Sequence, residues 1–410
     1  MTTPHAQQPR EVERSLHGCT AASIVVVQYA GDYREAYLRL AGGGPETYYA
    51  QRYSIDAVGA LVGAARRVAT ICCTCEDDYD EVLANGVRAI GLARTDAGVD
   101  ESKLWARIRD CQPTHLLLRT PLRHTLQQAV RSKLNVMLTL ADSFNGSGLR
   151  ARFRHWRLRR LLNAPAVVCV GNHGINASRS LLALGVTPSK VVAWDWPHAL
   201  SPNDFLAKSA PRSQAWSLLF VGIVCEEKGV GDLVRAVALL QGRGRDVHAT
   251  VVGRGDIEGF SALASSMGVG DKVKFRGQVS HAQIVPLMRE ADLLVVPSRH
   301  DYPEGFPMTI YEGLTSRTPI VASDHPMFRG RLEDRRTAMV FKAGDASGMA
   351  SAVATLMDSP ALYEALSEAS LPAWEALQIP VKWGDLVRSW AAPERPGDLA
   401  RLLAHGVPVT

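Results

Sequence analysis

Long hydrophobic runs are missing from this 410-residue sequence. Its longest purely apolar stretches, such as residues 24–27 and 293–296, fall far below the roughly 20 residues that a membrane-spanning helix needs. The first twenty residues contain two glutamates and no apolar stretch long enough for a signal peptide. We therefore expect a cytoplasmic protein without transmembrane segments.

The sequence also lacks the composition of a non-globular chain. It is 46% hydrophobic, 21% charged and 7% aromatic, which excludes disordered and collagen-like proteins. The length predicts two or three domains. A net charge of +5 permits an anionic partner such as a nucleotide or a phospholipid, but so small an excess selects none of them. No nucleic-acid reader motif is present, and we expect no nucleic-acid partner.

Cysteine is scarce, and its pattern is poor in metal-ligand spacing. The seven cysteines form an odd set that does not offer two CxxC pairs. Cys72, Cys73 and Cys75 could be metal ligands, but no histidine stands near them at ligand spacing. We interpret them as ordinary reduced thiols.

An Asp-x-Asp element in a strand-loop context is absent as well. Asp77, Asp78 and Asp80 could suggest a cation, but acidic residues favour the start of a helix, and we interpret this cluster that way. We therefore expect no metal site, no cofactor and metal-independent chemistry.

Short β-branched runs alternate with helix-length amphipathic segments, a pattern typical of parallel βαβ architecture. The first series of predicted strands lies near residues 23–28, 67–72, 87–90, 115–118, 135–140, 166–170 and 190–193. The second lies near residues 218–221, 247–252, 273–275, 293–296, 320–321 and 339–341. The fold class is therefore α/β, with two parallel-sheet domains of similar size.

Domain boundaries follow from changes in composition. The predicted units are a flexible segment at 1–20, an N-terminal domain at 21–196, a Pro/Ser-rich linker at 197–214, a C-terminal domain at 215–380, a helix at 381–392 that returns to the N-terminal domain, and a tail at 393–410. Domain-opening strands run toward glycine-containing turns, but neither turn has the GxGxxG pattern.

A triple glycine in the N-terminal domain allows two interpretations. Gly42, Gly43 and Gly44 precede Pro45 and Glu46, and proline followed by an acid favours a helix start at Pro45. The glycines could let backbone N–H groups approach a phosphate. They could equally form a flexible loop with a cap, because glycine relieves backbone strain as readily as it admits ligands.

The segment 298–312, which reads SRHDYPEGFPMTIYE, follows the buried-strand pattern ADLLVVP. A helix beginning near Pro307 would leave the amides of Met308 and Thr309 free to bind an anion. Glu304 would lie in the loop before that helix and Glu312 more than one turn inside it. Ionised carboxylates accept several hydrogen bonds and suit the hydroxyls of a sugar or ribose. The alternative is a solvent-facing pair of acids.

At these residues the sequence resembles the family-four retaining glycosyltransferases with the GT-B fold, glycosyl transferases group 1. The resemblance rests on residues 218–240, 251–256 and 273–280 and on the two glutamates eight positions apart that end at Glu312. It covers most of 216–360, whereas the N-terminal domain resembles the family more loosely. The resemblance implies two Rossmann-like domains facing across a cleft.

The resemblance also implies roles for individual residues. Glu312 would hold the ribose hydroxyls of a nucleotide-sugar donor, Glu304 would contact the donor sugar, and Lys228 would face the diphosphate. A lysine at a helix start is unfavourable to the helix dipole unless an anion binds there. The expected catalytic residues are Glu304 and Lys228, and the expected donor-binding residues are Gly222, Gln278, Val279, Phe306, Met308, Thr309 and Glu312.

Two positions depart from the family pattern. Ile223 stands where relatives often carry an arginine that helps to clamp the diphosphate, and loss of such a hydrogen bond costs about 1.5 to 3 kcal/mol if nothing replaces it. Asp142 stands at about the place of a cleft histidine. His173 is interpreted either as a cleft residue or as a turn histidine bonded to backbone. The expected acceptor or cleft residues are Gly43, Gly44, Asp142 and His173.

The implied reaction moves a sugar from the nucleotide donor to an acceptor hydroxyl with retention, in the synthesis of a cell-surface polysaccharide, a glycolipid or a natural-product glycoside. The leaving phosphate would take the acceptor proton, and stabilisation of the departing diphosphate would be electrostatic. Ile223 supports an alternative, a catalytically degenerate protein that binds a sugar nucleotide without transfer.

Six arginines lie within residues 150–160, interleaved with Phe153, His155 and Trp156. A helix here has poor separation of apolar and polar faces. One interpretation is peripheral contact with the inner face of a membrane and docking of an anionic, lipid-linked acceptor. The other is a solvated helix half buried against the sheet, and the sequence does not decide between them.

Overall fold

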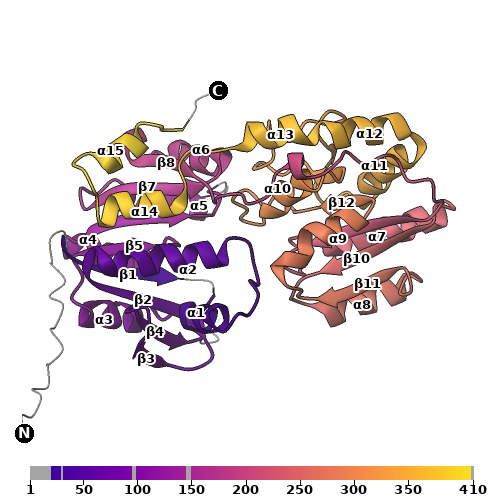
Figure 1. Cartoon of the computed structure of the whole chain (residues 1–410). Coiled ribbons are helices and arrows are strands. Elements are labelled where there is room, and N and C mark those ends of the chain that lie inside the picture. Colours follow the sequence, from indigo (N-terminus) through magenta and orange to yellow (C-terminus); the bar gives the residue numbers. More distant parts are fainter. Residues whose placement is uncertain (1–19, 29–30, 95–97, 145–148, 408–410) are drawn as a thin grey trace, which may run out of the picture.

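The structure, a computed structural model, describes residues 20–28, 31–94, 98–144 and 149–407. They form two α/β domains side by side (Figure 1). The predicted flexible segment 1–20 therefore lies almost wholly outside the described residues. None of the helices in the described ranges combines the length and apolarity that a membrane crossing requires.

An eight-stranded sheet forms the centre of the N-terminal domain. Its strands run in the order β3-β4-β2-β1-β5-β6-β7-β8, and neighbours pair in parallel except β3, which is antiparallel to β4. The bounds are β1 Thr20–Gln28, β2 Ala65–Cys75, β3 Tyr79–Val82, β4 Arg88–Ala93, β5 His115–Leu118, β6 Asn135–Leu140, β7 Val167–His173 and β8 Val191–Trp194. The helices are α1 Tyr33–Ala41, α2 Gln51–Gly59, α3 Glu101–Asp110, α4 Arg123–Arg131, α5 Leu149–Leu162 and α6 Ile175–Leu184.

A six-stranded, all-parallel sheet forms the centre of the C-terminal domain, in the order β11-β10-β9-β12-β13-β14. The bounds are β9 Trp216–Val221, β10 Val247–Val252, β11 Val273–Gly277, β12 Leu293–Val296, β13 Ile320–Ser323 and β14 Met339–Phe341. The helices are α7 Val230–Gly242, α8 Ile257–Ser266, α9 Ile284–Glu290, α10 Met308–Thr315, α11 Ala346–Asp358, α12 Pro360–Glu368 and α13 Ser370–Leu377. In this doubly wound order, successive strands from β9 to β11 extend the sheet on one side and those from β12 to β14 extend it on the other. The winding therefore reverses between β9 and β12, which is where such sheets bind ligands.

Both faces of each sheet are buried, as continuous apolar runs predict for parallel strands. In β1, Ile24 and Val26 pack into one core layer, whereas Val25 and Val27 pack into the opposite layer. This alternation comes from the two-residue period of a strand. All predicted strand runs overlap observed strands, but the prediction omitted β3.

The acids that we interpreted as a helix start belong instead to the edge hairpin. Asp80 lies in β3 and forms an ion pair of 2.7 Å with Arg88 of β4. Asp78 accepts a hydrogen bond from the amide of Ala93 and pairs with Lys103. The helix-start interpretation was wrong because these carboxylates are satisfied by a neighbouring strand and helix.

The triple glycine also differs from its predicted role. Gly42 caps the C-terminus of α1, and Gly43 has a φ of 78°, a left-handed conformation that favours glycine. No helix begins at Pro45, since α2 starts at Gln51. The glycines therefore end one helix rather than begin another.

The chain crosses between the domains twice, and the two crossings are hydrogen-bonded to each other. The amide of Asp195 donates to the Val381 carbonyl, and the amide of Trp383 donates to the Asp195 carbonyl. Beyond the second crossing, α14 Trp383–Ala391 packs into the N-terminal domain, where the Trp383 indole donates to Thr139. The segment expected to be a tail contains a further helix, α15 Asp398–Leu403, which packs on α14 and β8.

Candidate active site

Helix α10 begins at the point where the C-terminal sheet reverses its winding. Pro307 is its N-cap residue, and the sequence predicts a helix start near it. Proline suits this position because it has no backbone N–H to donate to a preceding turn. The first amide seen to pair is that of Ile310, which donates to the Pro307 carbonyl. The Thr309 hydroxyl donates to the carbonyl of Val221 at 3.3 Å, which fixes the helix start against the end of β9. The amides of Met308 and Thr309 thus head a helix dipole suited to an anion.

Glu304, in the loop between β12 and α10, is buried and forms an ion pair with Lys228. The same carboxylate accepts a hydrogen bond of 2.7 Å from the Ser298 hydroxyl. The Lys228 ammonium also lies 4.3 Å from the ring centre of Tyr302. The two residues expected to be catalytic therefore lie together, at the carboxyl ends of β9 and β12.

Lys228 is placed by the tight turn that precedes α7. Gly229 has a φ of 77°, and a side-chain Cβ there would lie 2.2 Å from the Pro297 carbonyl. The turn is anchored by Arg299, whose guanidinium bonds Glu226 at 2.6 Å and Asp232 at 2.8 Å. Hydrogen bonding to Asp232 and the nearby charges raise the pKa of Arg299, outweighing its burial. This anchor was not predicted from the sequence, although Arg299 lies inside the 298–312 segment.

Glu312 is buried inside α10, and its carboxylate lies 2.7 Å from the His281 imidazole. Burial raises the pKa of Glu312, and His281 offsets this only in part. Burial also acts to lower the pKa of His281, but the hydrogen bond and charge of Glu312 outweigh it, so the pKa is raised. His281 was not predicted, although it directly follows the 273–280 segment that carries the family resemblance.

A loop of the N-terminal domain, residues 42–50, lies against this part of the C-terminal domain. The His281 amide donates to the Glu46 carbonyl at 2.9 Å, and the Gln278 side chain donates to the Thr47 carbonyl at 3.3 Å. The Tyr49 ring meets the His281 ring edge-on at 5.2 Å. Gly43 and Gly44 shape this loop, but the contacts come from the residues that follow them.

On the other side of Glu304, two glycines, one from each domain, allow the domains to approach closely. A Cβ on Gly305 would lie 2.8 Å from the Ala141 carbonyl, and one on Gly174 would lie 2.9 Å from the Cβ of Phe306. Asp142, next to Ala141, is half-buried, and burial raises the pKa of its carboxyl to about 6. Asp142 and Phe306 therefore lie at the interface between the domains.

His173, the last residue of β7, is buried in the N-terminal domain, and its role as a cleft residue stays a prediction. Its Nε2 lies 3.1 Å from Asp195, which also lies 3.0 Å from His198. Burial alone would raise the pKa of Asp195, but its bonds to the two imidazoles hold that pKa well below the usual range. These residues stabilise the first chain crossing, and the turn-histidine interpretation erred only in naming backbone as the partner.

The remaining predicted donor residues surround the end of β9. The Gly222 carbonyl leaves no room for a side chain on Gly253, whose Cβ would lie 1.7 Å away. Ile223 is 46% exposed, and its apolar side chain supplies no charge at this position. Val279 packs at the edge of the core beneath α10. The predicted residues from β9, β11, β12 and α10 thus converge at one edge of the C-terminal sheet.

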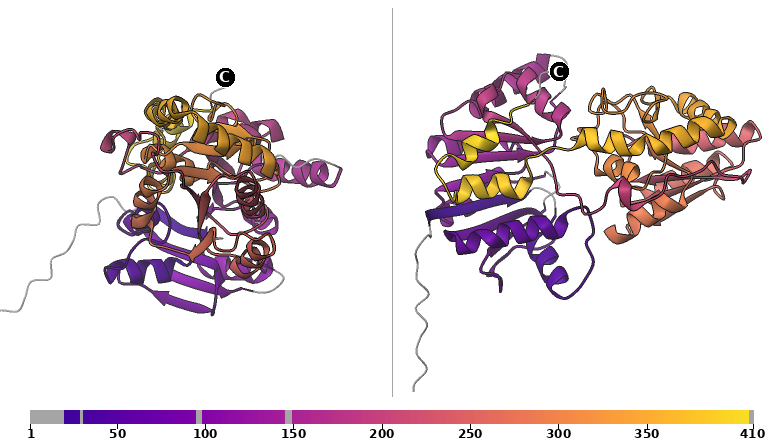
Figure 2. Two further views of the ribbon diagram at one scale, coloured as in Figure 1. Left: turned by 90° about the vertical axis from the view of Figure 1, so that its right-hand side faces the viewer. Right: turned by 45° about the horizontal axis from the view of Figure 1, so that its top comes forward.

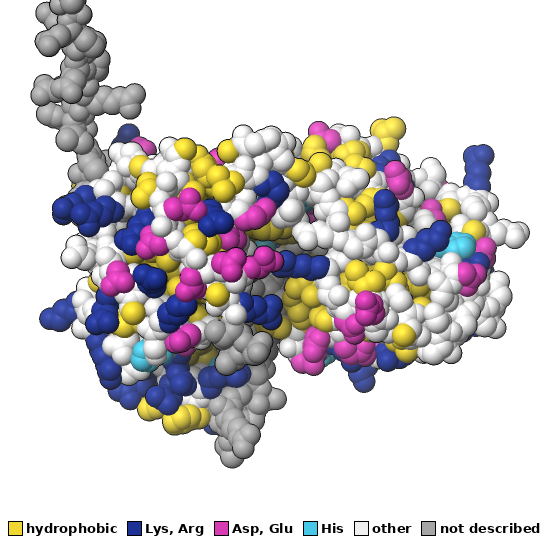
Figure 3. All heavy atoms as spheres, turned by 90° about the horizontal axis from the view of Figure 1, so that it is seen from below, with side chains coloured by type: hydrophobic (Ala, Val, Ile, Leu, Met, Phe, Trp, Pro, Cys, Tyr) yellow, Lys and Arg dark blue, Asp and Glu magenta, His cyan; other side chains and the backbone are white. Residues whose placement is uncertain are grey.

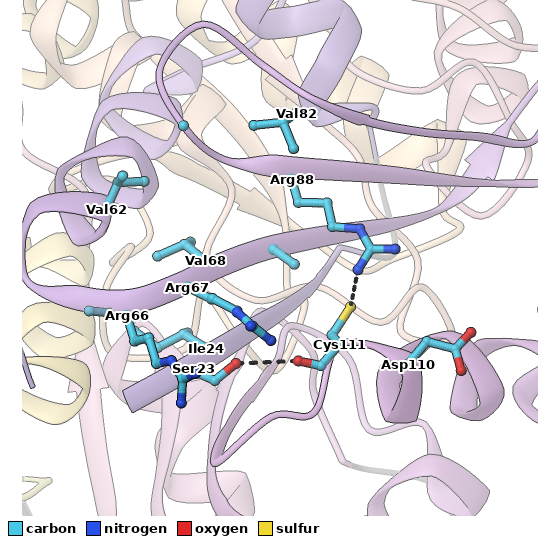
Figure 4. Close-up of a pocket in the computed structure, with 13 residues that line it drawn as sticks. Ser23, Ile24, Val62, Arg66, Arg67, Val68, Val82, Arg88, Asp110 and Cys111 are labelled. Carbon is cyan, nitrogen blue, oxygen red and sulfur yellow. Dashed lines mark hydrogen bonds between the residues drawn. The ribbon is translucent and has the colours of Figure 1, made fainter. Parts of the chain in front are cut away.

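A hollow of about 290 Å³ lies elsewhere, at the amino ends of β1, β2 and β4 (Figure 4). Arg66, Arg67 and Arg88 border it, but Arg88 is paired with Asp80. The hollow lies at the amino ends of strands in the N-terminal domain, whereas Glu304 and Lys228 lie at the carboxyl ends of strands in the C-terminal domain. Open α/β sheets bind ligands at the carboxyl ends of their strands, so this hollow is a poor substrate site.

On the face seen from below, acidic and basic side chains meet along the seam between the lobes (Figure 3).

Residues 203–371 match the family model of glycosyl transferases group 1, which confirms the resemblance for the C-terminal domain. An alpha-D-kanosaminyltransferase of Streptomyces kanamyceticus is 34% identical over 156 residues, which cover 38% of this chain and 40% of that protein. A phosphatidyl-myo-inositol mannosyltransferase of Mycobacterium leprae (strain TN) is 33% identical over 149 residues, 36% of this chain and 39% of that protein. The matches thus span about two fifths of these relatives.

The whole fold has solved counterparts. The crystal structure of Anabaena Alr3699/HepE in complex with UDP is 14% identical, with a TM-score of 0.60 over 87% of this chain and 95% of that one. The architecture is GT-B, two Rossmann-like domains that face each other, as the resemblance implied.

Proposed function

We propose that this protein is a glycosyltransferase that moves a sugar from a nucleotide-sugar donor to an acceptor hydroxyl. The observation that carries the proposal is the start of α10, where free amides stand between the buried carboxylates of Glu304 and Glu312. Lys228 adds a cation beside them. This combination suits a ligand that carries both a diphosphate and hydroxyls.

The comparisons support the class of reaction. Both curated relatives carry transferase names, and the matched region contains the Lys228 turn and the whole α10 segment. The Anabaena protein was solved with UDP, which supports a nucleotide-sugar donor for a protein of this fold.

In the proposed reaction, the ribose hydroxyls bond Glu312 and a donor-sugar hydroxyl bonds Glu304. The amides of Met308 and Thr309 and the Lys228 ammonium stabilise the charge that develops on the departing diphosphate. The leaving phosphate accepts the acceptor proton on the same face, and the anomeric configuration is retained. Positive charge comes from the protein itself, so the proposal requires no metal ion and no cofactor.

Donor binding would replace two contacts that the protein makes within itself. His281 now bonds Glu312, and Lys228 now bonds Glu304. Both glutamates would exchange these partners for hydroxyls, and Lys228 would turn to the diphosphate. The buried setting strengthens such charged hydrogen bonds because water is excluded.

A protein that binds a sugar nucleotide without transfer is the second candidate, and the exposed Ile223 favours it. Mass spectrometry of products and thermal shifts with UDP, GDP and ADP sugars separate the two. A transferase gives a shift and releases nucleotide when an acceptor is present, whereas a binder gives the shift alone. Absence of any shift at millimolar donor would contradict both.

The matched control for this experiment is Glu375→Ala, at an exposed acid of α13. Glu312→Ala should abolish the donor-induced shift, whereas Glu375→Ala should retain it. Glu304→Ala should lower transfer more than donor binding, because its partner is the sugar rather than the nucleotide.

The acceptor side of the proposal involves α5, which projects from the N-terminal domain (Figure 2, left). Phe153 and Trp156 are 60% and 48% exposed and stack at 5.9 Å, while Leu158 and Leu162 are buried. Arg157 and Arg160 lie over the two aromatic rings. Exposed aromatics among arginines suit the interface of an anionic membrane. We propose peripheral contact there from the cytoplasmic side and an acceptor that can be lipid-linked.

A further inference from the structure

Three potential metal ligands converge in the N-terminal domain, away from Glu304 and Lys228. Ligand atoms of Asp32, Cys72 and Cys75 all lie within 4.8 Å of one another. Cys72 and Cys75 are buried, and Asp32 is half-buried at the start of α1. The sequence analysis considered the cysteines alone, because nothing in the sequence places an aspartate forty positions earlier beside them.

The geometry of β2 brings the two thiols to the same face of the sheet. Its pairing with β4 shifts register between Cys72 and Cys75, and both side chains enter the same core layer. Cys73 enters the opposite layer. Without the register shift, residues three apart in a strand would point to opposite faces.

Asp32 is held with one carboxylate oxygen toward α1. Its Oδ1 accepts hydrogen bonds from the amides of Arg34 and Glu35, at 2.8 and 3.2 Å, as an N-cap does. The Asp32 carboxylate is also hydrogen-bonded to the Cys75 thiol. The carboxylate therefore caps the helix and at the same time reaches one of the two thiols.

Tyr79 adds a fourth polar atom to the group. Its hydroxyl donates to Asp32 Oδ1 at 2.5 Å and lies 3.8 Å from the Cys75 sulfur. The ring is fixed over the backbone of Gly91, where a Cβ would lie 2.1 Å from it. The Arg34 guanidinium lies 4.1 Å from the centre of this ring and pairs with Glu81. Strand β3, which the sequence did not predict, thus orients the ligand set.

Gln28 provides an independent sign that the group is incomplete. It is 3% exposed and pairs in register with Cys72, so its side chain lies on the same face of the sheet. Its Nε2 is buried without a hydrogen-bond partner among the described residues. A buried donor without a partner costs about 1 to 3 kcal/mol, which a thiolate or a metal-bound water beside it would offset.

We propose that Cys72, Cys75 and Asp32 bind a thiophilic divalent cation of the zinc class. Two thiolates and a carboxylate match the ligand preference of Zn²⁺, and a water or the Tyr79 hydroxyl completes four ligands. A tetrahedral site with metal–sulfur bonds of about 2.3 Å needs sulfurs about 3.8 Å apart, a small closure of the present arrangement. Binding displaces one proton from each thiol to solvent.

The cation would stabilise the part of the N-terminal domain that lies next to the 42–50 loop. It would tie the turn after β1 to the end of β2, and Gly31 in that turn faces the Tyr48 hydroxyl of the 42–50 loop. The role is structural, and no step of sugar transfer depends on it. The site therefore stands or falls independently of the proposed function.

Metal content of the purified full chain tests the site directly. The reduced protein, stripped with chelator and titrated with Zn²⁺, should bind one equivalent by elemental analysis. Titration with Co²⁺ should give a thiolate-to-cobalt charge-transfer band. Zn²⁺ should also raise the Tm, because a ligand of the folded state stabilises it. Cys75→Ser and Asp32→Asn should remove or weaken all three signals, and Asp32→Asn keeps an oxygen for the helix cap.

The control is Cys73→Ser, a neighbouring buried cysteine on the opposite face of β2. It should retain one equivalent of metal and the cobalt band. The proposal is wrong if the reduced wild type binds no metal, or if Cys73→Ser and Cys75→Ser lose it equally. A Cys72–Cys75 disulfide found by peptide mass mapping, with no metal uptake after reduction, would also overturn it.

Discussion

The Lys228 ammonium and the Glu304 carboxylate form a partly buried ion pair although 76 positions separate them in the chain. Each comes from a loop at the carboxyl end of a central strand, one after β9 and the other after β12. The pair compensates both charges. In the proposed reaction, a bound sugar diphosphate would separate the ammonium from the carboxylate, because each would bond a different part of the donor.

Removal of one partner should cost more stability than removal of both. Lys228→Ala leaves the Glu304 carboxylate buried without its cation, and we expect the free energy of unfolding to fall by about 3 kcal/mol. The double variant with Glu304→Ala should recover part of this loss. Urea unfolding of the four proteins in the cycle measures the coupling. Arg235→Ala, on a half-exposed cation that shares its carboxylate partners with Arg299, is the control and should change little.

Stability should depend on pH through His281 and Glu312. The folded-state pKa of His281 is raised, so its contribution is complete below the unfolded pKa of about 6.5 and is lost as pH rises through the folded value. The raised pKa of Glu312 acts in the same direction, because burial penalises its charged form. Glu46, 3.7 Å from His281, is the other charge facing the ring. Tm measured from about pH 6 to pH 9 should therefore decline.

His281→Gln should flatten that decline, since glutamine donates to Glu312 at every pH. His248→Gln, at a largely exposed histidine of β10, should leave the slope unchanged. An identical slope in wild type and His281→Gln would show that the Glu312 contact does not govern it.

Asp142 should give a separate pH signature. Its pKa is raised to about 6 by burial, so the folded protein holds the proton more tightly than the unfolded chain. The carboxyl therefore destabilises the fold progressively as pH rises through about 6. Asp142→Asn should raise the free energy of unfolding at pH 8 by about 1 to 3 kcal/mol and leave it nearly unchanged near pH 4. Asp110→Asn, at an exposed acid, should show no such contrast.

Gly305→Ala should disturb the approach of the two domains. The new Cβ would lie 2.8 Å from the Ala141 backbone, which cannot rotate away. We expect transfer to fall about 10- to 100-fold, because small misplacements of reacting groups cost that much. Donor binding should change less, since Glu312 and the α10 amides belong to one domain. Gly242→Ala, where a Cβ meets nothing within 4 Å, provides the control.

Membrane contact through α5 should depend on its exposed rings. Phe153→Ser with Trp156→Ser should lower co-sedimentation with phosphatidylglycerol vesicles several-fold, and wild type should bind phosphatidylcholine vesicles weakly. Exchange of the exposed Leu206 for Ser, outside α5, should have no effect. Equal binding to both lipids, or none to either, would leave the solvated-helix interpretation.

Strands in the two domain cores were predictable because their apolar runs are continuous and local. Strand β3 was not, because Tyr79–Val82 is largely polar and exists through its pairing with β4 and the fit of Tyr79 on Gly91. The Gly42–Gly44 run was misassigned because glycine before proline fits a helix end as well as a helix start. The hydrogen bonds of the Gly42 cap to the Leu38 and Leu40 carbonyls show that the run terminates α1.

The residues of the candidate site also fall into two groups, those that local sequence predicts and those that only the fold brings together. Glu304, Glu312 and the start of α10 lie in one short segment, so local sequence revealed them. Their partners come from other elements: Lys228 from the turn before α7, which the resemblance suggested, and His281 from beyond β11, which nothing suggested. The contact of His173 with Asp195 was not predictable from local sequence, because the pairing of β7 with β8 brings the two residues together.

The hydrogen-bonded chain crossings at Asp195 and Val381 determine how the lobes can separate. Both covalent connections pass through one spot, so the molecule has a single pivot, and opening requires no strand to leave its sheet. The contacts to be broken include the Gln278 bond to Thr47 and the Asn176 bonds to Met327 and Arg329. The proposed donor would reach the first turn of α10 by a swing of one lobe, and the return swing would exclude water around it.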